Sequence, residues 1–445
     1  MSIENETNPV RVSCGTKQTG ETRPMGWVER SVWTDRMLEA LDKGVKGGVW
    51  FSLIDKVYRP TTLYAAWQAV KRNGGSAGTD HESVERFEER LEENIAGLAE
   101  ELRTETYRPR PVKRVYIDKL GSREKRPLGI PAVRDRVVQA AIRLVVEPIF
   151  EQQFRPHSYG FRPNRGCKDA LREVDRLLKA GYTHVVDADL KAYFDSIPHD
   201  RLMQDIRRNI ADGRLLKLIE SFLEQDIWDG LSRWTPEKGT PQGAVISPLL
   251  ANLYLHPVDE AMEAAGYQMI RYADDFVMMC RDEAEANKAL HEVQQLITER
   301  GLVLHPEKTR VVDTTIAGQG FDFLGYHFER GTRWPRKKSL KKLKDTIRSH
   351  TGRSNGHSLP VITANMNRTL KGWFEYYKHS HKWTFSMLDG WIRRRLRSIL
   401  RKRSKGTKGI SGNMDHFRWP NKFFQELGLF SLEDAHALLL QSSLR

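Results

Sequence analysis

The segment RYADDFVMMC, residues 271–280, places two adjacent aspartates directly before an uninterrupted apolar run. Asp274 and Asp275 can form a tight turn, because aspartate tolerates turn geometry. They can also hold a divalent cation, since a metal ion stabilises carboxylates that would otherwise repel each other. This segment by itself leaves both interpretations open, and the choice depends on which other carboxylates the fold places beside it.

A second acidic pair lies in THVVDADL, residues 183–190, which has the composition of a buried strand. Side chains alternate between the two faces of a strand, so Asp187 and Asp189 are predicted to share one face. Asp274 and Asp275 are predicted to lie at the bend between two short strands. The loop GTPQG lies between the two acidic segments, and its glycines allow the backbone to approach a ligand closely.

Carboxylates on adjacent strands can hold two Mg²⁺ ions about 3.5–4 Å apart. Asp189, Asp274 and Asp275 are therefore candidates for a two-metal site. One ion would activate a 3′-hydroxyl as nucleophile, and the other would hold a triphosphate and its departing pyrophosphate, which is in-line phosphoryl transfer. Without a cation, clustered aspartates repel one another and tend to take up protons, so a metal would explain why the fold tolerates them.

The elements that must position these groups follow from hydrophobic periodicity and turn residues. The alternating segment RPVKRVYIDK, closed by the polar turn LGSREKR, predicts a β-hairpin. Asp135 is predicted to cap the helix that follows it. The predicted helices cover 34–46, 61–73, 82–103, 135–154 and 282–300, and short strands are predicted around Val303 and at 310–313.

The composition is typical of a globular protein with more than one domain. The chain has 445 residues, 39% hydrophobic residues and a mean hydropathy of −0.58, and this length favours two to four domains. No apolar stretch approaches the length of a membrane span, and the polar start lacks the apolar core of a signal peptide. Three scattered cysteines, Cys14, Cys167 and Cys280, favour neither a disulfide framework nor a zinc site. We expect a cytoplasmic protein with no membrane partner.

Positive charge is concentrated toward the C-terminus. From residue 331 onward the chain has 25 basic and 7 acidic residues, against 47 basic and 51 acidic before it. Such segregation favours a polyanionic partner, and the Trp and Tyr residues among the basic ones favour nucleic acid over a membrane surface. Trp373, Tyr376 and Tyr377 can stack on bases or belong to a helical core. The basic residues predicted here to bind RNA are Lys341, Lys344, Arg393, Arg394, Arg395 and Arg397.

Seven segments in a fixed order resemble the motifs of reverse transcriptases, and specifically those of the bacterial group II intron-encoded reverse transcriptase/maturases. This resemblance covers about residues 60–330, and residues 331–400, with LKGWFEYYKH and GWIRRRLR, resemble the maturase or thumb domain. The seven segments are REKRPLGIPAVRDRVVQ (123–139), HSYGFRPNRG (157–166), DLKAYFD (189–195), GTPQGAVISPLLANLYL (239–255), YADD (272–275), HPEKTR (305–310) and FDFLGYHF (321–328).

The resemblance implies a right-hand polymerase of the α+β class, with fingers and an antiparallel palm sheet followed by an α-helical thumb. Asp189, Asp274 and Asp275 would be the catalytic ligands of two Mg²⁺ ions, while Asp187 would make a structural hydrogen bond. Phe194 would be a steric gate whose ring occupies the space of a 2′-hydroxyl. The residues implied to bind the incoming dNTP are Lys119, Arg126, Phe194, Gln242 and Lys308.

Part of this nucleotide site has a second interpretation. Lys119 and Arg126 would grip the triphosphate, or could merely solvate a turn in which Arg123 and Lys125 are rival candidates. The sequence has IDK at 117–119 where the family usually has IPK. Lys308 would lie near the leaving group, or could be an ordinary surface lysine.

Two further sets of residues carry alternatives as well. Arg162 and Arg165 could bind the phosphates of the template RNA, or could anchor their own loop. Asp195 and Asp200 are expected to cap or solvate the helix that follows them.

The function implied is that of an RNA-directed DNA polymerase encoded by a group II intron, which also binds the intron RNA to assist splicing and copies it into DNA during retrohoming. Its partners would be group II intron RNA, an RNA template/DNA primer duplex, target DNA and dNTPs. The alternatives are a splicing maturase without polymerase activity and a reverse transcriptase reused in defence or DNA repair. No cysteine follows Cys280, so we expect no HNH endonuclease. The expected regions are an N-terminal extension, partly disordered (1–59), fingers and palm (60–330), a helical thumb/maturase domain (331–403) and a small basic DNA-binding-like region (404–445).

Overall fold

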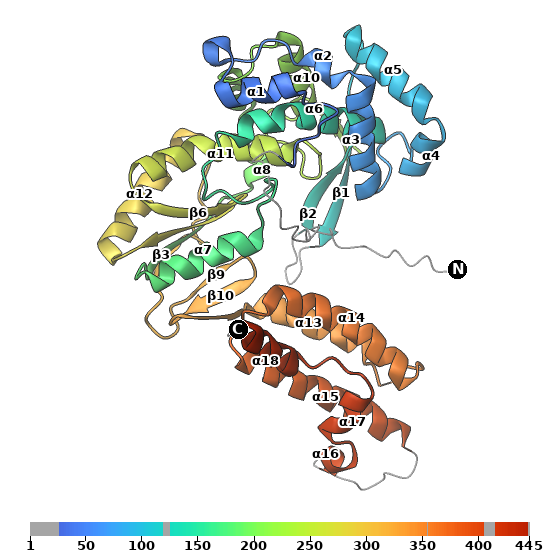
Figure 1. Ribbon diagram of the computed structural model, residues 1–445, viewed down its shortest axis with the longest axis vertical. Helices are drawn as coiled ribbons and strands as arrows, with labels where there is room; N and C mark the ends of the chain where they lie inside the picture. Colours follow the sequence, from blue (N-terminus) through green and yellow to red (C-terminus); the bar gives the residue numbers. More distant parts are fainter. Residues whose placement is uncertain (1–25, 119–124, 354, 405–413, 444–445) are drawn as a thin grey trace.

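The computed structural model describes residues 26–118, 125–353, 355–404 and 414–443. Three sheets and the helices around them organise this part of the chain (Figure 1). The structure therefore has the predicted class, with antiparallel sheet pairing in the middle of the chain and helices after it.

The first part of the chain packs helices and a small sheet, here called the fingers sheet, around one long helix, α6. Its elements are α1 (Asp35–Lys43), the 3-10 helix η1 (Lys46–Gly48), α2 (Ile54–Val57), α3 (Pro60–Asn73), α4 (Val84–Glu89), α5 (Leu91–Arg103), β1 (Val112–Asp118), β2 (Lys125–Ile130), α6 (Val133–Glu151), α10 (Gly213–Leu223), β4 (Ile227–Trp228) and β5 (Arg233–Trp234). The fingers sheet has the order β2-β1-β4-β5. Trp33 and Val57 are fully buried in the same core as Trp67, so residues before 60 contribute to this core.

The position of Asp135 corrects one prediction. Helix α6 begins at Val133 with Ala132 as its N-cap, and Asp135 lies inside the first turn, fully buried. Its carboxylate accepts hydrogen bonds from the Tyr107 hydroxyl at 2.5 Å and from the Arg110 backbone nitrogen at 2.9 Å. Burial raises the pKa of Asp135 to about 6. The prediction of a helix cap is wrong because partners distant in the sequence take up this carboxylate.

The middle of the chain forms a second sheet, here called the palm sheet, with the order β6-β7-β3-β8 and antiparallel pairing throughout. The elements of this region are α7 (Cys167–Lys179), β3 (His184–Asp189), α8 (Tyr193–Ser196), α9 (His199–Arg207), α11 (Ser247–Ala264), β6 (Gln268–Tyr272), β7 (Asp275–Cys280), α12 (Glu283–Glu299) and β8 (Arg310–Asp313). One face packs against α11 and α12 through side chains such as Val186 and Met278. The other face packs against α7 through side chains such as Val185 and Val277. Strand β8 matches its predicted range, whereas around Val303 the structure has only an isolated bridge between Leu190 and Leu304.

The C-terminal part is a small three-stranded sheet followed by helices with a core of their own. Its elements are β9 (Phe321–Phe323), β10 (Tyr326–Glu329), β11 (Thr332–Pro335), α13 (Lys337–His350), α14 (Leu359–Tyr377), α15 (Trp383–Arg403), α16 (Asp415–Arg418), α17 (Asn421–Glu426) and α18 (Leu432–Ser443). Phe424 and Leu432 are buried in the same cluster as Leu370 and Leu396, so the last helices pack onto α14 and α15.

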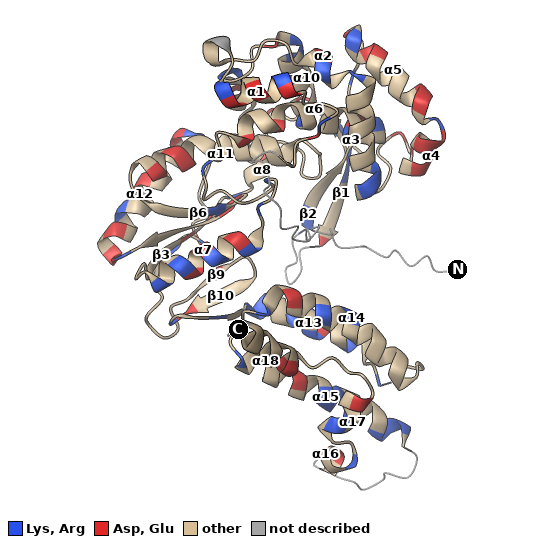
Figure 2. Ribbon diagram, in the orientation of Figure 1, with Lys and Arg blue, Asp and Glu red and all other residues tan. Residues whose placement is uncertain are grey.

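Charge is distributed unevenly over these elements. Figure 2 shows Lys and Arg residues along α13 and α15, and acidic residues on α4, α5 and α12. This pattern places the basic excess of the sequence on the C-terminal helices. Among the residues that the structure describes, none of the helices is both long and apolar enough to span a membrane.

Candidate active site

The palm sheet brings the predicted carboxylates together at one end. Asp189, the last residue of β3, is the cross-strand partner of Asp275, the first residue of β7. Directly opposed residues of antiparallel strands have Cβ atoms about 4.5–5.5 Å apart. Asp274 lies in the turn between β6 and β7, next to Asp275. Asp187 and Asp189 share a strand face by alternation, as predicted.

The electrostatics of this cluster are those of crowded, partly buried carboxylates. Burial, and after it the charges of Asp187, Asp189 and Asp274, raise the pKa of Asp275 to about 7. The pKa of Asp274 is also raised, first by burial and then by Asp189. The site therefore favours a cation that would offset this repulsion.

Basic side chains already approach two of these aspartates. The Lys308 ammonium contacts Asp189 Oδ2, and the backbone nitrogen of His305 donates to the Asp189 carbonyl oxygen at 2.7 Å, which fixes the lysine loop beside β3. Arg310 Nε donates to Asp187 Oδ2 at 3.4 Å. This contact confirms the predicted structural role of Asp187. Lys308 is thus a site residue by position, although more than half of its side chain is exposed.

The donor set fits a hard divalent cation. In the described part of the chain, no three His, Cys, Asp or Glu side chains converge closely enough to form a ready-made metal site. The available donors at this end of the sheet are nevertheless carboxylate oxygens, which Mg²⁺ prefers. Asp189 accepts a positive group here, since the Lys308 ammonium lies on its carboxylate. We conclude that the three aspartates fit a Mg²⁺ site.

Two of the predicted nucleotide residues, Arg126 and Gln242, connect the fingers sheet to the GTPQG loop. Arg126 Nε, on β2, donates to Gln242 Oε1 at 2.8 Å, and Gln242 Nε2 donates to Asp195 Oδ2 at 3.3 Å. The Gly129 backbone nitrogen donates to the Gln242 carbonyl oxygen at 2.6 Å. Gly243 has φ +109°, and a Cβ there would overlap the Gly129 carbonyl oxygen, so only glycine allows this close contact.

Asp195 has a role that the sequence did not predict. It was expected to cap or solvate a helix, but its carboxylate accepts from Gln242 instead. Burial raises its pKa, while Arg114 and Arg126 oppose that rise. The expectation of a capping role for Asp195 is therefore wrong.

Phe194 lies in the short helix α8 and is only 8% exposed. Its ring meets that of Tyr193 edge-on, with centroids 5.5 Å apart, and the Tyr193 hydroxyl donates to the Ala251 carbonyl oxygen at 2.5 Å. The Thr240 backbone nitrogen donates to the Phe194 carbonyl oxygen at 2.7 Å. The phenylalanine is thus held firmly beside the GTPQG loop. Lys119 and its rival Arg123 lie outside the described residues, and the other rival, Lys125, is exposed on β2.

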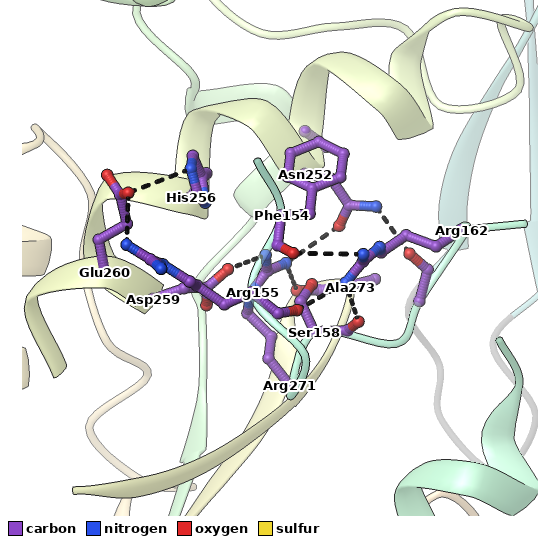
Figure 3. A network of polar contacts seen from close by, with 12 residues as sticks. Phe154, Arg155, Ser158, Arg162, Asn252, His256, Asp259, Glu260, Arg271 and Ala273 are labelled. Carbon is purple, nitrogen blue, oxygen red and sulfur yellow. Dashed lines mark hydrogen bonds and ion pairs between the residues drawn. The ribbon is translucent and has the colours of Figure 1, made fainter. Parts of the chain in front are cut away.

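The two arginines of the loop between α6 and α7 differ in role. The buried Arg162 guanidinium pairs with Glu151 at 2.7 Å. It also donates to the carbonyl oxygens of Arg155 and Ser158, both at 2.6 Å (Figure 3). These contacts support the loop-anchoring alternative, and the prediction that Arg162 binds RNA is wrong because its donors are already used. Arg165 also donates to a loop carbonyl, that of Pro156, but its side chain remains partly exposed.

A buried ion pair supports the turn that carries the aspartates. Arg271, on β6, is fully buried and pairs with Asp259 of α11 at 2.5 Å (Figure 3). The same guanidinium donates to Asn252 Oδ1 and to the Ala273 carbonyl oxygen, both at 3.0 Å. Ala273 has φ +60°, a left-handed conformation that costs free energy for a residue with a Cβ. The sequence analysis missed this pair, for which the available signal was an arginine inside the otherwise apolar run of β6.

We predict that Asp259→Ala lowers the free energy of unfolding by about 3–5 kcal/mol, because it leaves Arg271 buried without a counter-charge. Glu260→Ala is the matched control, since the neighbouring Glu260 pairs with Arg155 at the surface at 2.9 Å. That variant should lose less than about 1 kcal/mol. Urea unfolding followed by circular dichroism measures both, and equal losses would contradict the prediction.

The basic residues of the C-terminal helices fall into two groups. Lys341 and Arg394 are exposed, while Lys344 lies over the Trp391 ring at 5.6 Å. Arg393 lies 4.0 Å from Asp389 within α15 itself. The other two arginines join α15 to its neighbours, because Arg395 donates to the Thr351 hydroxyl (2.7 Å) and Arg397 to the Trp419 carbonyl (2.9 Å).

The aromatic residues of α14 serve as core. Trp373 and Tyr377 stack with ring centroids 4.7 Å apart, and the Tyr376 hydroxyl donates to the Leu324 carbonyl oxygen at 2.7 Å. Both tyrosine rings also contact Tyr326 of β10. They therefore join the helical region to the small sheet. Of the two predicted roles, base stacking or core packing, the structure supports core packing.

An antiparallel palm sheet with two consecutive aspartates, one in a hairpin turn and the next at the start of a strand, and a third on the adjacent strand defines the right-hand polymerase class. The family model described as "Reverse transcriptase (RNA-dependent DNA polymerase)" matches residues 117–328, and that of the "Group II intron, maturase-specific domain" matches residues 340–419. The chain belongs to the reverse transcriptases that carry a group II intron maturase domain.

Similar proteins come from several organisms. "Group II intron-encoded protein LtrA" of Lactococcus lactis subsp. cremoris is 38% identical over 204 residues, which are 45% of this chain and 33% of that protein. "Protein YkfC" of Escherichia coli (strain K12) is 34% identical over 322 residues, which cover 62% of this chain and 83% of that protein. An "Uncharacterized 91 kDa protein in cob intron" of Schizosaccharomyces pombe is 41% identical over 169 residues, which cover 38% of this chain and 21% of that protein. The chain thus matches about a third of the length of the Lactococcus protein.

Proposed function

We propose that the protein is an RNA-directed DNA polymerase that also binds group II intron RNA. The observation that carries the proposal is the pairing of Asp189 with Asp275 across the palm sheet, with Asp274 in the adjoining turn. A protein that only binds RNA has no need for three carboxylates placed so close together that the charge of Asp189 raises the pKa of both Asp274 and Asp275.

Each residue of the site would have a distinct task. Asp189, Asp274 and Asp275 would hold two Mg²⁺ ions. When bound, these ions would activate the primer 3′-hydroxyl and neutralise the departing pyrophosphate. Lys308 would move from Asp189 toward the pyrophosphate, because the cation would replace it on the carboxylate.

The residues between fingers and palm would select the nucleotide. Arg126, with Lys119, would grip the triphosphate, and Gln242, which contacts both Arg126 and Asp195, would line the nucleotide pocket. The ring of Phe194 would occupy the space that a 2′-hydroxyl needs, so the site would prefer deoxynucleotides. Catalysis would then rest on positioning and on charge neutralisation.

Primer extension tests this proposal. The wild-type protein should extend oligo(dT) on poly(rA) with dTTP and Mg²⁺, and EDTA should stop the reaction. Asp274→Asn should show no extension while folding normally. A wild-type protein that extends no primer under these conditions would refute the polymerase function.

We also propose that residues 331–403 are the thumb/maturase domain that binds intron RNA, which would assist splicing and allow the RNA to be copied into DNA during retrohoming. The exposed cations of α13 and α15 support this assignment. Residues 60–330 would form fingers and palm, after an N-terminal extension (1–59). Residues 404–445 would meet the target DNA, although they carry only 5 basic against 4 acidic residues.

The salt dependence of RNA binding checks the thumb assignment. Each phosphate contact adds about 0.7–0.9 to the slope of log K against log salt. We predict that replacing both Lys341 and Arg394 with Ala flattens this slope by about 1.4–1.8. Arg395→Ala is the matched control. It should lower the free energy of unfolding and leave the salt slope of RNA binding nearly unchanged, since this arginine is hydrogen-bonded to Thr351. An unchanged slope in the double variant would place the RNA elsewhere.

A further inference from the structure

The loop between α6 and α7 is attached to the palm sheet beside the aspartate turn. The Tyr159 backbone nitrogen donates to the Arg271 carbonyl oxygen at 2.8 Å, and the Arg271 backbone nitrogen donates to the His157 carbonyl oxygen at 2.9 Å. Asn252 Nδ2 donates to the Gly160 carbonyl oxygen at 2.6 Å. A Cβ on Gly160 would overlap the Ala273 backbone nitrogen, so loop and turn are in direct contact.

This attached loop presents an exposed aromatic residue. Phe161 is 45% exposed and has φ +58°, a left-handed conformation that is unfavourable for a bulky side chain. Exposure of an apolar ring and a strained backbone both oppose stability, and strain of this kind is typical of functional positions. The ring belongs to none of the hydrophobic cores of the described residues.

The position of Phe161 relates it to the catalytic aspartates. Its ring centroid is 6.4 Å from that of Tyr272, and Tyr272 is the cross-strand partner of Asp275. Asp275 is in turn the partner of Asp189. Paired residues of antiparallel strands point to the same face. Phe161 therefore continues a row of side chains that crosses one end of the palm sheet from the carboxylates through Tyr272.

We propose that Phe161 packs against the DNA primer strand within its last three nucleotides. This inference rests on the proposed polymerase function, because the primer 3′-hydroxyl must then lie at the aspartates. Successive nucleotides of one strand are about 3.4 Å apart, so the row from Asp275 through Tyr272 to Phe161 is long enough for the ring to reach past the terminal nucleotide. An aromatic ring can stack on any base or pack on any sugar, and the contact needs no particular sequence.

Three variants separate the ring from the backbone strain. Phe161→Ala removes the ring and keeps the left-handed strain, Phe161→Gly removes both, and Phe161→Tyr keeps the ring. The free energy of unfolding of Phe161→Gly should be at least that of the wild type, because glycine adopts positive φ without steric cost. Phe51→Ala is the matched control, since Phe51 is 68% exposed and lies just before α2.

The test measures binding of a fluorescently labelled RNA template/DNA primer duplex in EDTA, where no extension can occur. Phe161→Ala and Phe161→Gly should bind about tenfold more weakly, whereas Phe161→Tyr and Phe51→Ala should bind as wild type does. With 2-aminopurine at each of the last three primer positions in turn, the fluorescence change on binding should be reduced in Phe161→Gly. In extension assays with Mg²⁺, KM for the duplex should rise while kcat changes little.

Failure of this inference differs from failure of the polymerase proposal. If wild type extends the primer and Phe161→Gly binds and extends equally well, the inference is wrong and the polymerase function stands. If wild type extends no primer but Phe161→Gly still loses duplex affinity and the 2-aminopurine response, the contact is upheld and the polymerase function is refuted. A loss confined to single-stranded RNA would also overturn the inference.

Discussion

Asp275→Asn should abolish polymerisation and at the same time make the protein more stable at pH 8. The loss follows because the developing charge of phosphoryl transfer would no longer be offset by a correctly held ion, an effect of several kcal/mol and thus of about a thousandfold or more in rate. The gain follows from the surroundings of Asp275, whose pKa is raised to about 7 by burial and by three neighbouring aspartates.

The sign of the pH dependence is fixed by the direction of this shift. In the unfolded chain an aspartate has a pKa near 3.9. Below that pH both states are protonated and Asp275 costs nothing. As the pH rises toward 7 the unfolded state loses its proton first, so the folded protein becomes progressively less stable, and above pH 7 the full cost applies.

The raised pKa of Asp275 sets an upper limit on the stability gained in Asp275→Asn. A shift from about 3.9 to about 7 corresponds to at most about 4 kcal/mol, and solvent screening reduces this, so we expect a gain of about 1–3 kcal/mol for Asp275→Asn at pH 8. The advantage should shrink as the pH falls toward 4. Urea unfolding in EDTA at several pH values measures it. Asp313→Asn is the control, since Asp313 lies on the same sheet at the surface and has a lowered pKa. A destabilised Asp275→Asn at pH 8 would show that the carboxylate cluster is not repulsive.

Phe194→Ala should raise the use of ribonucleotides relative to deoxynucleotides by about a hundredfold. An apolar pocket discriminates by about this factor against a substrate that carries an added hydroxyl, and the ring of Phe194 would supply that apolar surface. The ring cannot easily move aside, because it packs on Tyr193, which is itself hydrogen-bonded to Ala251.

The measured quantity is the ratio of kcat/KM for dTTP to that for UTP in extension of oligo(dT) on poly(rA). The ratio cancels any loss of folded protein, which matters because a buried phenylalanine truncated to alanine costs about 3–5 kcal/mol. Phe194→Tyr keeps the ring and should retain discrimination against UTP. An unchanged ratio in Phe194→Ala would assign the gate to another side chain.

The local pattern of the sequence was sufficient for the strands that carry the carboxylates, while the palm sheet as a whole was implied by the resemblance to reverse transcriptases. Alternation placed Asp187 and Asp189 on one face. The polar residues inside an apolar pair of strands predicted a bend at Asp274 and Asp275, and the structure has Asp274 in the turn and Asp275 as the first residue of β7. Strand β8 was also predicted within its observed range. These features depend on the two-residue period of strands and on turn propensity, which act over a few residues and are therefore visible in the sequence.

Partnerships across the fold were not visible in this way. Asp135 has the residue type of a helix cap, but its carboxylate accepts hydrogen bonds from Tyr107 and Arg110. Arg162 has the charge of a phosphate ligand, but it forms an ion pair with Glu151. Asp195 was expected to cap or solvate the helix that follows it, yet its carboxylate accepts a hydrogen bond from Gln242.

The sequence by itself determined which chemistry the chain carries: three aspartates at strand ends, a phenylalanine and a glutamine near them, and a basic C-terminal part. Only the tertiary structure decided which charged side chains remain available for that chemistry. The physical reason is that a buried charge must be paired, and its partner is chosen by packing between segments far apart in the sequence. The pairing of Arg271 with Asp259 and the contact of Phe161 with Tyr272 are further results of that packing.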